Sequence, residues 1–305
     1  MRTIMATLGS ALLALALAGG GAEGADRIRV VTTTADLKAL TEAVGGDLVE
    51  VDSLARGNQN PHDLEIRPSL MVKVRRADLL VINGLDLDQW VELVVRGASN
   101  PRVLPGAAGR VDASDGVPLL EVPAGRVDRS MGDIHPLGNP HYTLDPGTAP
   151  QVTANILAGL ARLVPQSRAA FEKNRAEFLG RLEAAMSRWQ ATLAPFKGAK
   201  VVQYHINFVY LLARFGLVKA GGIEERPGIP ATPTHLARLI QDMKQEGIRL
   251  VVVEPWNDVK LADRVAQDAG ATVRVLAPSV GALKEAKTYV DTIDYNVRAL
   301  ADGLR

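Results

Sequence analysis

The 305-residue sequence contains no cysteine. This absence excludes disulfides, thiolate metal sites and thiol nucleophiles. Aromatic residues make up only 4% of the chain, and its one GGG run, at 19–21, does not follow a predicted strand. A carbohydrate or anion binder is therefore poorly supported. Basic and acidic residues balance at 35 to 34 with no basic run, so neither nucleic acid nor an anionic membrane is an expected partner.

Long apolar runs are also scarce, and only one is found, close to the N-terminus. Arg2 precedes the apolar residues 4–18, and the small residues of AGGGAEGAD follow. A positive residue, a short apolar run and a small-residue tract are typical of an export signal. We therefore expect a signal peptide over residues 1–25, in preference to a membrane anchor, and a mature protein that is soluble in the periplasm.

Strand and helix patterns alternate through the rest of the chain. Strands are predicted in both halves at 27–33, 47–54, 78–83 and 101–106 (PRVLPG), and at 199–205, 217–223, 249–254 and 271–278. Helical patterns lie between them at 35–46, 67–77, 86–98, 207–216, 232–247 and 258–270. This alternation predicts an α/β fold of two lobes with parallel sheets. We expect an N-terminal lobe over 26–150 and a C-terminal lobe over 198–305.

A linking helical segment is expected over 151–197. From Gln166 to Leu193 the large apolar side chains recur mostly three, four or seven residues apart, which marks one face of a helix. Without an internal proline this helix could extend about 40 Å at about 1.5 Å per residue. One long helix would then join and brace the two lobes, so we expect only small motions between them.

Three of the five histidines stand where a ligand site is expected. His205 ends a predicted strand, His62 lies in the loop after the strand 47–54, and His141 lies in GNPHYTLDP, between two prolines that fix the backbone. Open α/β sheets bind ligands at the carboxyl ends of their strands. Three imidazoles that converge there would form a site with high affinity for zinc.

The other two histidines are weaker candidates. His235 lies inside a predicted helix, in PTHLARL, and is interpreted as a surface or half-buried residue. His135 lies in MGDIHPLGNPH, close to His141 in sequence. It is interpreted as an ordinary loop residue, with a contact during metal entry as the alternative.

Several motifs resemble one known family. NPHDLEIRPS, GNPHYTLDP, YHINFVYLLARFGL and IEERPGIPATPTHLARLI occur in order across almost the whole mature chain. They are similar to the zinc and manganese solute-binding proteins of bacterial ABC importers. The resemblance implies two α/β lobes joined by a long helix, metal ligands at His62, His141 and His205, and a membrane permease as partner. It also implies a carrier rather than an enzyme, and we expect a monomer.

The sequence departs from the family pattern in two places. Members commonly supply an acidic fourth ligand near the C-terminus, but in EAKTYVDTIDYNV that position appears as Lys287, with Asp291 and Asp294 nearby. The fourth ligand is therefore left open among Asp291, Asp294, His135 and water. The segment before GNPH also lacks a histidine-rich loop.

Three nitrogen ligands favour Zn²⁺ over Mn²⁺, which prefers oxygen.

Two alternatives to a zinc carrier remain. The first is a carrier of manganese or another divalent metal. The second is a zinc hydrolase, because three histidines and a water also form a catalytic arrangement. A hydrolase needs a positioned general base, for which Glu224, Glu225 and Glu254 are the candidates. The first two are equally well explained as surface charges, and Glu254 as a residue that caps a strand end.

Overall fold

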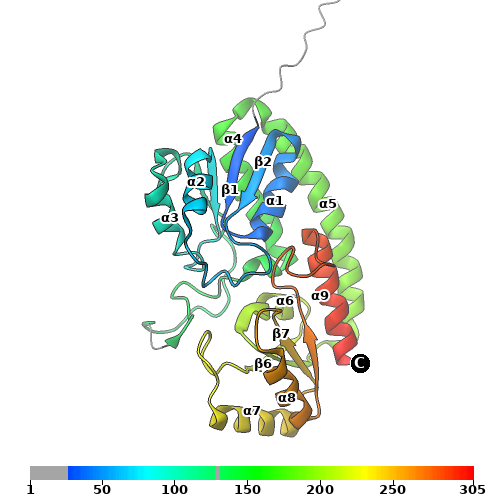
Figure 1. Ribbon diagram of the computed structural model, residues 1–305. Helices are drawn as coiled ribbons and strands as arrows, with labels where there is room; N and C mark the ends of the chain where they lie inside the picture. The colour runs from blue at the N-terminus through cyan, green and yellow to red at the C-terminus, as the bar shows by residue number, and fades with distance from the viewer. Residues whose placement is uncertain (1–26, 128–130) are drawn as a thin grey trace, which may run out of the picture.

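The computed structural model describes residues 27–127 and 131–305, so the expected signal peptide lies outside the described residues. Two lobes lie one below the other, and one long helix, α5, runs along the same side of both (Figure 1). Each lobe contains a four-stranded parallel sheet. The predicted α/β class with two parallel-sheet lobes is confirmed. Within the part of the chain described here, no helix is both long and apolar enough to cross a membrane.

The N-terminal sheet has the strand order β2-β1-β3-β4. Its strands are β1 (Ile28–Thr32), β2 (Val49–Ser53), β3 (Leu79–Ile82) and β4 (Arg110–Asp112). Successive side chains of a strand point to opposite faces of the sheet. Val30 and Val81 accordingly pack in the cluster with α1 (Ala35–Gly45) and α4 (Ala149–Leu163), while Val31 and Leu80 pack with α2 (Pro68–Arg76) and α3 (Val91–Ala98).

The C-terminal sheet repeats this order as β6-β5-β7-β8. Its strands are β5 (Lys200–Gln203), β6 (Val218–Gly222), β7 (Leu250–Val253) and β8 (Thr272–Val275). Val251 and Val253 pack with α7 (Pro233–Glu246) and α8 (Val259–Ala269). On the other face, Val252 packs in the cluster that includes α6 (Val209–Arg214) and α9 (Tyr289–Leu304). Both sheets are therefore covered on both faces, as parallel sheets require.

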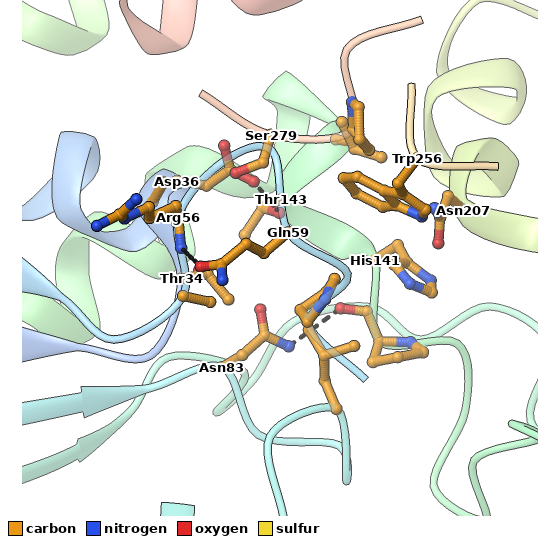
Figure 2. Close-up of a pocket in the computed structure, with 17 residues that line it drawn as sticks. Thr34, Asp36, Arg56, Gln59, Asn83, His141, Thr143, Asn207, Trp256 and Ser279 are labelled. Carbon is orange, nitrogen blue, oxygen red and sulfur yellow. Dashed lines mark hydrogen bonds between the residues drawn. The ribbon is translucent and has the colours of Figure 1, made fainter. Parts of the chain in front are cut away.

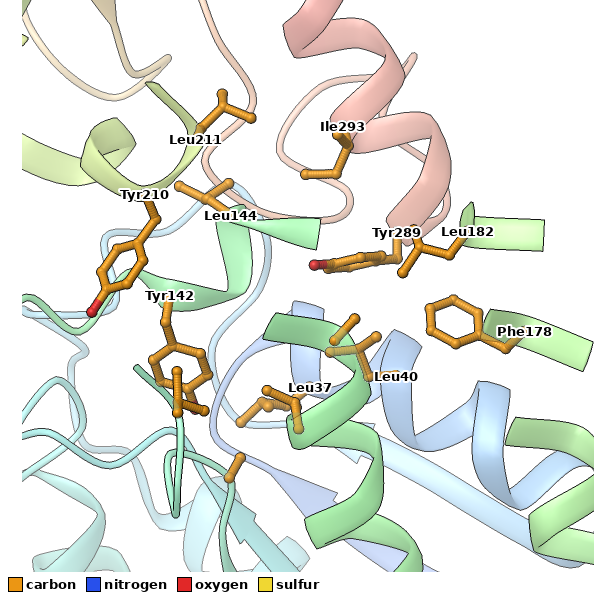
Figure 3. Close-up of a cluster of buried hydrophobic side chains, with 14 of the residues drawn as sticks. Leu37, Leu40, Tyr142, Leu144, Phe178, Leu182, Tyr210, Leu211, Tyr289 and Ile293 are labelled. Atoms are coloured by element: carbon orange, nitrogen blue, oxygen red, sulfur yellow. The ribbon is translucent and has the colours of Figure 1, made fainter. Parts of the chain in front are cut away.

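The long helix is α5 (Arg168–Leu193), and its buried positions are largely those that the periodicity predicted. At 26 residues it spans about 39 Å. Its apolar face and the start of α9 meet where Phe178 contacts Tyr289, with ring centroids 6.1 Å apart. Figure 3 shows this cluster continuing from Leu37 and Leu40 of α1 to Leu211 of α6. Because one core runs through both lobes, α5 braces them as expected.

One predicted strand is wrong, and some elements were not predicted. PRVLPG forms a 3₁₀ turn, η2, where the Asn100 side chain accepts a hydrogen bond from the Arg102 amide, and the edge strand β4 begins only at Arg110. The two prolines flanking RVL remove amide donors that a strand would need. A separate α4 and the C-terminal α9 were not predicted either. The 3₁₀ turns with fully described residues are η1 (Gly46–Leu48), η2 (Pro101–Val103), η4 (Tyr142–Leu144), η5 (Pro146–Thr148), η6 (Pro165–Ser167), η7 (Ala194–Phe196) and η8 (Ile206–Phe208).

Candidate metal centre

Three imidazoles meet between the lobes. His62 comes from the loop after β2, His141 from the connection after β4, and His205 directly precedes η8 after β5. One ring nitrogen of each lies within 4.8 Å of the others. Nε2 of His62 and Nε2 of His141 are 3.1 Å apart. The structure thus brings together the three histidines singled out in the sequence, two from the N-terminal side and one from the C-terminal lobe.

The backbone around His141 is fixed by side-chain amides. Oδ1 of Asn139 accepts hydrogen bonds from the His141 amide at 3.0 Å and from Nδ1 of its ring at 2.9 Å. The Asn83 side chain donates to the carbonyl of Pro140 at 3.1 Å, as Figure 2 shows beside the pocket that His141 lines. With Nδ1 as the donor, the neutral ring carries its lone pair on Nε2, the nitrogen that faces His62.

A carboxylate orients His205 in the same way. Nδ1 of His205 donates to Oε2 of Glu224 at 2.7 Å, and the same oxygen accepts from the Gly228 amide at 2.7 Å. Nε2 of His205 is buried and has no hydrogen-bond partner among the described residues. A buried ring nitrogen that is left unpaired while the other is bonded to a carboxylate is the arrangement of metal-binding histidines.

The loop that carries His62 is held by two hydrogen bonds to its backbone. Oδ1 of Asn60 accepts from the His62 amide at 3.1 Å, and the Trp90 indole donates to the Pro61 carbonyl at 2.8 Å. The ring centroids of His62 and His205 lie 5.2 Å apart. These contacts fix the backbone on both sides of the cluster, so the imidazoles are preorganised before a ligand binds.

The electrostatic environment keeps two of the rings neutral. Burial, together with the neighbouring histidines, lowers the pKa of His62 and of His141 well below the ordinary value. For His205, burial alone would lower the pKa, but the hydrogen bond to Glu224 and the charges of Glu254, Glu224 and Asp133 raise it. Neutral imidazoles are the form that binds metal.

One nitrogen–nitrogen distance in the cluster is close to that expected around a tetrahedral metal ion. Two nitrogens bound to one zinc at about 2.0–2.1 Å lie about 3.3–3.4 Å apart. The 3.1 Å between the Nε2 atoms of His62 and His141 is close to this separation. All three donors are nitrogens, which suits zinc better than a hard cation.

The three glutamates considered as general bases each have other hydrogen-bond or ion-pair partners. Glu224 bonds His205 and Gly228. Glu225 pairs with Arg238 at 3.2 Å on an exposed surface. Glu254 is buried, and its two oxygens accept from the side chains of Asn207 and Asn257, each at 2.8 Å.

The remaining two histidines differ in their relation to the cluster. His235 begins α7, and its Nε2 donates to the carbonyl of Gly222 at 2.9 Å, so it supports the backbone after β6. His135 packs against His62 with ring centroids 5.1 Å apart. Burial lowers the pKa of His135 to about 4, and its buried Nε2 has no hydrogen-bond partner among residues 27–127 and 131–305. His135 is not one of the three residues whose nitrogens lie within 4.8 Å of one another.

The residues proposed as an acidic fourth ligand take part in other interactions. Asp291 completes the capping box at the start of α9 with Thr288. Asp294 accepts from the Trp189 indole at 3.1 Å and pairs with Arg298. Lys287 is exposed and lines, with Asp291, a pocket against α1 and α5. None of the three belongs to the histidine group found among the described residues.

The role of Glu224 beside His205 was missed in the sequence. His205 follows β5 and Glu224 follows β6, and these strands are neighbours in the sheet. Because the carboxyl ends of neighbouring parallel strands meet at one edge, the pairing becomes predictable once the strand order is known. The role of Asn139 is easier to see in the sequence, because an asparagine side chain commonly accepts a hydrogen bond from the backbone amide two residues later.

Known proteins resemble this chain in sequence and in fold. The family model described as zinc-uptake complex component A periplasmic matches residues 30–303. The high-affinity zinc uptake system protein ZnuA of Bacillus subtilis (strain 168) is 26% identical over 286 residues, covering 92% of this chain and 88% of that protein. The manganese ABC transporter substrate-binding lipoprotein PsaA of Streptococcus pneumoniae is 24% identical over 302 residues, covering 96% of this chain and 94% of PsaA.

A solved structure agrees with these relatives. The crystal structure of a ZnuA deletion mutant with zinc bound superimposes with a TM-score of 0.77 at 25% identity, covering 91% of this chain and 98% of that chain. The family and its structural neighbours are transport proteins, so the hydrolase alternative is set aside. The chain belongs to the family of periplasmic zinc-uptake complex component A proteins, the zinc and manganese solute-binding proteins of ABC importers.

Proposed function

We propose that this protein binds zinc between its two lobes, outside the cytoplasm, and delivers it to the membrane permease of an ABC importer. His62, His141 and His205 are the proposed ligands. The observation that carries the proposal is the convergence of their three ring nitrogens within 4.8 Å. Because the ligands come from both lobes, the metal would join them, and a small change between the lobes would weaken its binding.

The choice of zinc over manganese follows from the donor set. Manganese prefers oxygen ligands, and the group of potential ligands found among the described residues contains no carboxylate. The similarity to PsaA, a manganese transporter lipoprotein, makes Mn²⁺ the alternative cargo. We propose further that the mature protein is a periplasmic monomer whose lobes, 26–150 and 198–305, are linked by the segment 151–197.

Zinc titration of single variants tests the site. Competition with a chelating dye should show that His62→Ala, His141→Ala and His205→Ala each weaken zinc binding at least about tenfold, or about 1.4 kcal/mol. His235→Ala is the control, because this histidine bonds a backbone carbonyl and not the cluster. Wild-type affinity in His141→Ala would contradict the proposal.

The cargo and its delivery need separate measurements. Metal analysis of protein isolated from its native compartment should find zinc in excess of manganese. Cells that lack this chain should grow poorly when zinc is chelated and recover when zinc, but not manganese, is added. Recovery with manganese alone would identify manganese as the transported metal.

A further inference from the structure

We propose that Gly57 is a positioning residue of the metal centre, because its close contact with Val280 of the C-terminal lobe fixes where His62 lies relative to His205. This inference rests on the proposed function and deepens it, since it names what sets the separation of ligands from different lobes. Two segments are involved. Residues 54–62, here called the His62 loop, follow β2, and residues 278–282, here called the Val280 turn, lie between β8 and α9.

Gly57 is buried under the backbone of the Val280 turn. A methyl group on Gly57 would collide with the Val280 carbonyl oxygen and would lie 2.8 Å from the Ala282 amide nitrogen. Both are main-chain atoms, which cannot turn aside as a flexible side chain can. The φ of Gly57 is outside the left-handed region, so its backbone conformation is open to other residues. The glycine is therefore required by the contact with the other lobe and not by the loop itself.

The Val280 turn is held in place on its other sides. Oδ1 of Asp36 in α1 accepts a hydrogen bond from the Val280 amide at 2.8 Å, and the Val280 side chain packs against the core that runs through both lobes. Just before the turn, the Ala277 amide donates to Oδ1 of Asn296 in α9 at 2.7 Å. Because the turn is fixed in this way, a methyl group at Gly57 would displace the His62 loop.

His141 is tied to the C-terminal lobe independently of this contact. The Asn139 side chain donates to the carbonyl of Ile206 at 3.0 Å, and the Tyr210 hydroxyl donates to the Asn139 carbonyl at 2.9 Å. Ile206 directly follows His205. By contrast, no hydrogen bond between described residues joins the His62 loop to the C-terminal lobe. His141 and His205 thus form a fixed pair, and His62 is placed against them by packing.

The size of the displacement decides its effect on the metal. A carbon and a carbonyl oxygen in contact stay about 3.3–3.6 Å apart, so relief of the collision moves the backbone by on the order of 1 Å. Metal–ligand distances in a competent site lie within about 0.2 Å of their ideal values. The centroids of the His62 and His205 rings are only 5.2 Å apart. A retreat of the His62 loop would therefore remove His62 from a metal held by His141 and His205.

Zinc titration of the full mature chain against a chelating dye tests this role. Gly57→Ala should lower zinc affinity at least about tenfold, with an apo melting temperature close to that of the wild type. Gly109→Ala is the matched control, because a methyl group there meets the backbone oxygens of Arg102 and Asp78 within the N-terminal lobe. It should lower the melting temperature and leave zinc affinity unchanged.

A double-mutant cycle separates positioning from a general structural effect. Since Gly57 acts through His62, Gly57→Ala should cost no further affinity in the His62→Ala background and should cost its full amount in the His141→Ala background. Equal losses in both backgrounds, or wild-type affinity in Gly57→Ala alone, would overturn the inference.

A second variant loosens the same contact without a collision. Asp36→Ala removes the acceptor that holds the Val280 amide. The freedom that the His62 loop gains must be lost again when zinc binds, so affinity should fall at least about threefold, and only while His62 is present. If Gly57→Ala does not fold, Asp36→Ala decides, and wild-type zinc affinity there overturns the inference.

These outcomes can be told apart from failure of the proposed function. If the wild-type protein does not bind Zn²⁺, or if His62→Ala binds it as the wild type does, the proposed site itself is wrong. If His62→Ala weakens binding and Gly57→Ala does not, only the positioning role of Gly57 is wrong.

Discussion

Oε2 of Glu224 accepts a hydrogen bond of 2.7 Å from Nδ1 of His205, and this contact joins the ends of the neighbouring strands β5 and β6. It fixes the ring so that Nε2 faces the cluster. A carboxylate that bonds a metal-binding imidazole also raises its basicity and hence its strength as a ligand. Glu224 would therefore act on a bound metal through His205.

Removing this carboxylate should weaken the site without removing a ligand. Glu224→Ala should lower zinc affinity by about 10–100-fold, the usual effect of losing such an outer contact. Glu224→Gln should lose less, since the amide oxygen can still accept the bond from Nδ1. Dye competition measures both, and Glu225→Ala is the matched control, because Glu225 pairs with Arg238 on the surface. Equal affinities for Glu224→Ala and Glu225→Ala would contradict the role of Glu224.

The pH dependence of zinc binding should follow His205. Its pKa is raised, whereas those of His62 and His141 are lowered. On acidification His205 is thus the first of the three proposed ligands to gain a proton, which zinc would have to displace. Apparent affinity should fall about tenfold per pH unit below the raised pKa, since one proton is released.

Two comparisons check this pH profile. In Glu224→Gln the decline should begin at lower pH, because the negative charge that raises the pKa of His205 is gone. A slope of about three decades per pH unit near neutrality would instead mean that all three imidazoles titrate together.

Zinc should also stabilise the folded protein. A ligand that binds only the folded state adds about 2.7 kcal/mol at a hundredfold excess over Kd. The melting temperature should therefore rise with zinc and the gain should shrink as the pH falls, while the apo protein still unfolds cooperatively around its continuous core. An apo form without a cooperative transition would contradict the two-lobe core.

Much of the fold could be predicted because it depends on local pattern. The apolar period of α5 and the buried runs of β3 and β7 are properties of short segments. α9 was not predicted, although the segment after Thr288 has a helical period. In PRVLPG the apolar residues suggested a strand, but the flanking prolines produced a turn.

The site was predictable only in part, for a physical reason. His62, His141 and His205 lie beside strand ends or prolines, which can be recognised in the sequence. The packing of His135 on His62 joins residues 73 positions apart and depends on how the segment around Asp133 meets Pro227 of the other lobe. Likewise, the contact between Trp189 and Asp294 depends on the packing of α5 against α9.

The acidic residues near the C-terminus should not affect zinc binding. Asp291→Ala removes the capping box of α9 and should cost about 0.5–2 kcal/mol of stability, with zinc affinity unchanged. Asp294→Ala leaves the Trp189 indole without its acceptor and should likewise destabilise the fold. Lys287→Ala should leave both properties nearly unchanged, because the side chain is exposed. A loss of zinc affinity in either aspartate variant, as large as that of His205→Ala, would identify a carboxylate ligand.

The buried carboxylate of Asp36, which lines the same pocket as His141, connects the two lobes. Asp36 of α1 accepts from the Val280 amide at 2.8 Å and from the Thr143 hydroxyl at 3.2 Å, and Figure 2 shows Asp36 beside Thr143 and Ser279. Burial raises the pKa of Asp36 to about 6 from 3.8. The folded state therefore favours the protonated acid. This contribution to stability is complete below the unfolded pKa and is lost as the pH rises through about 6.

Asp36→Asn should reveal this loss, since an amide does not titrate. Relative to Asp36→Asn, the wild-type apo protein should lose about 2 kcal/mol of unfolding free energy between pH 4.5 and pH 7.5, because the folded pKa lies about 1.5 units above the lower pH and each unit is about 1.36 kcal/mol. Asp36→Ala is the control: it leaves the Val280 amide without an acceptor and should cost about 1–3 kcal/mol at neutral pH. Urea unfolding at pH 4.5 and pH 7.5 measures the three proteins. A difference between wild type and Asp36→Asn that is the same at both pH values would mean that Asp36 titrates normally, so that burial at the junction of the lobes does not hold its proton.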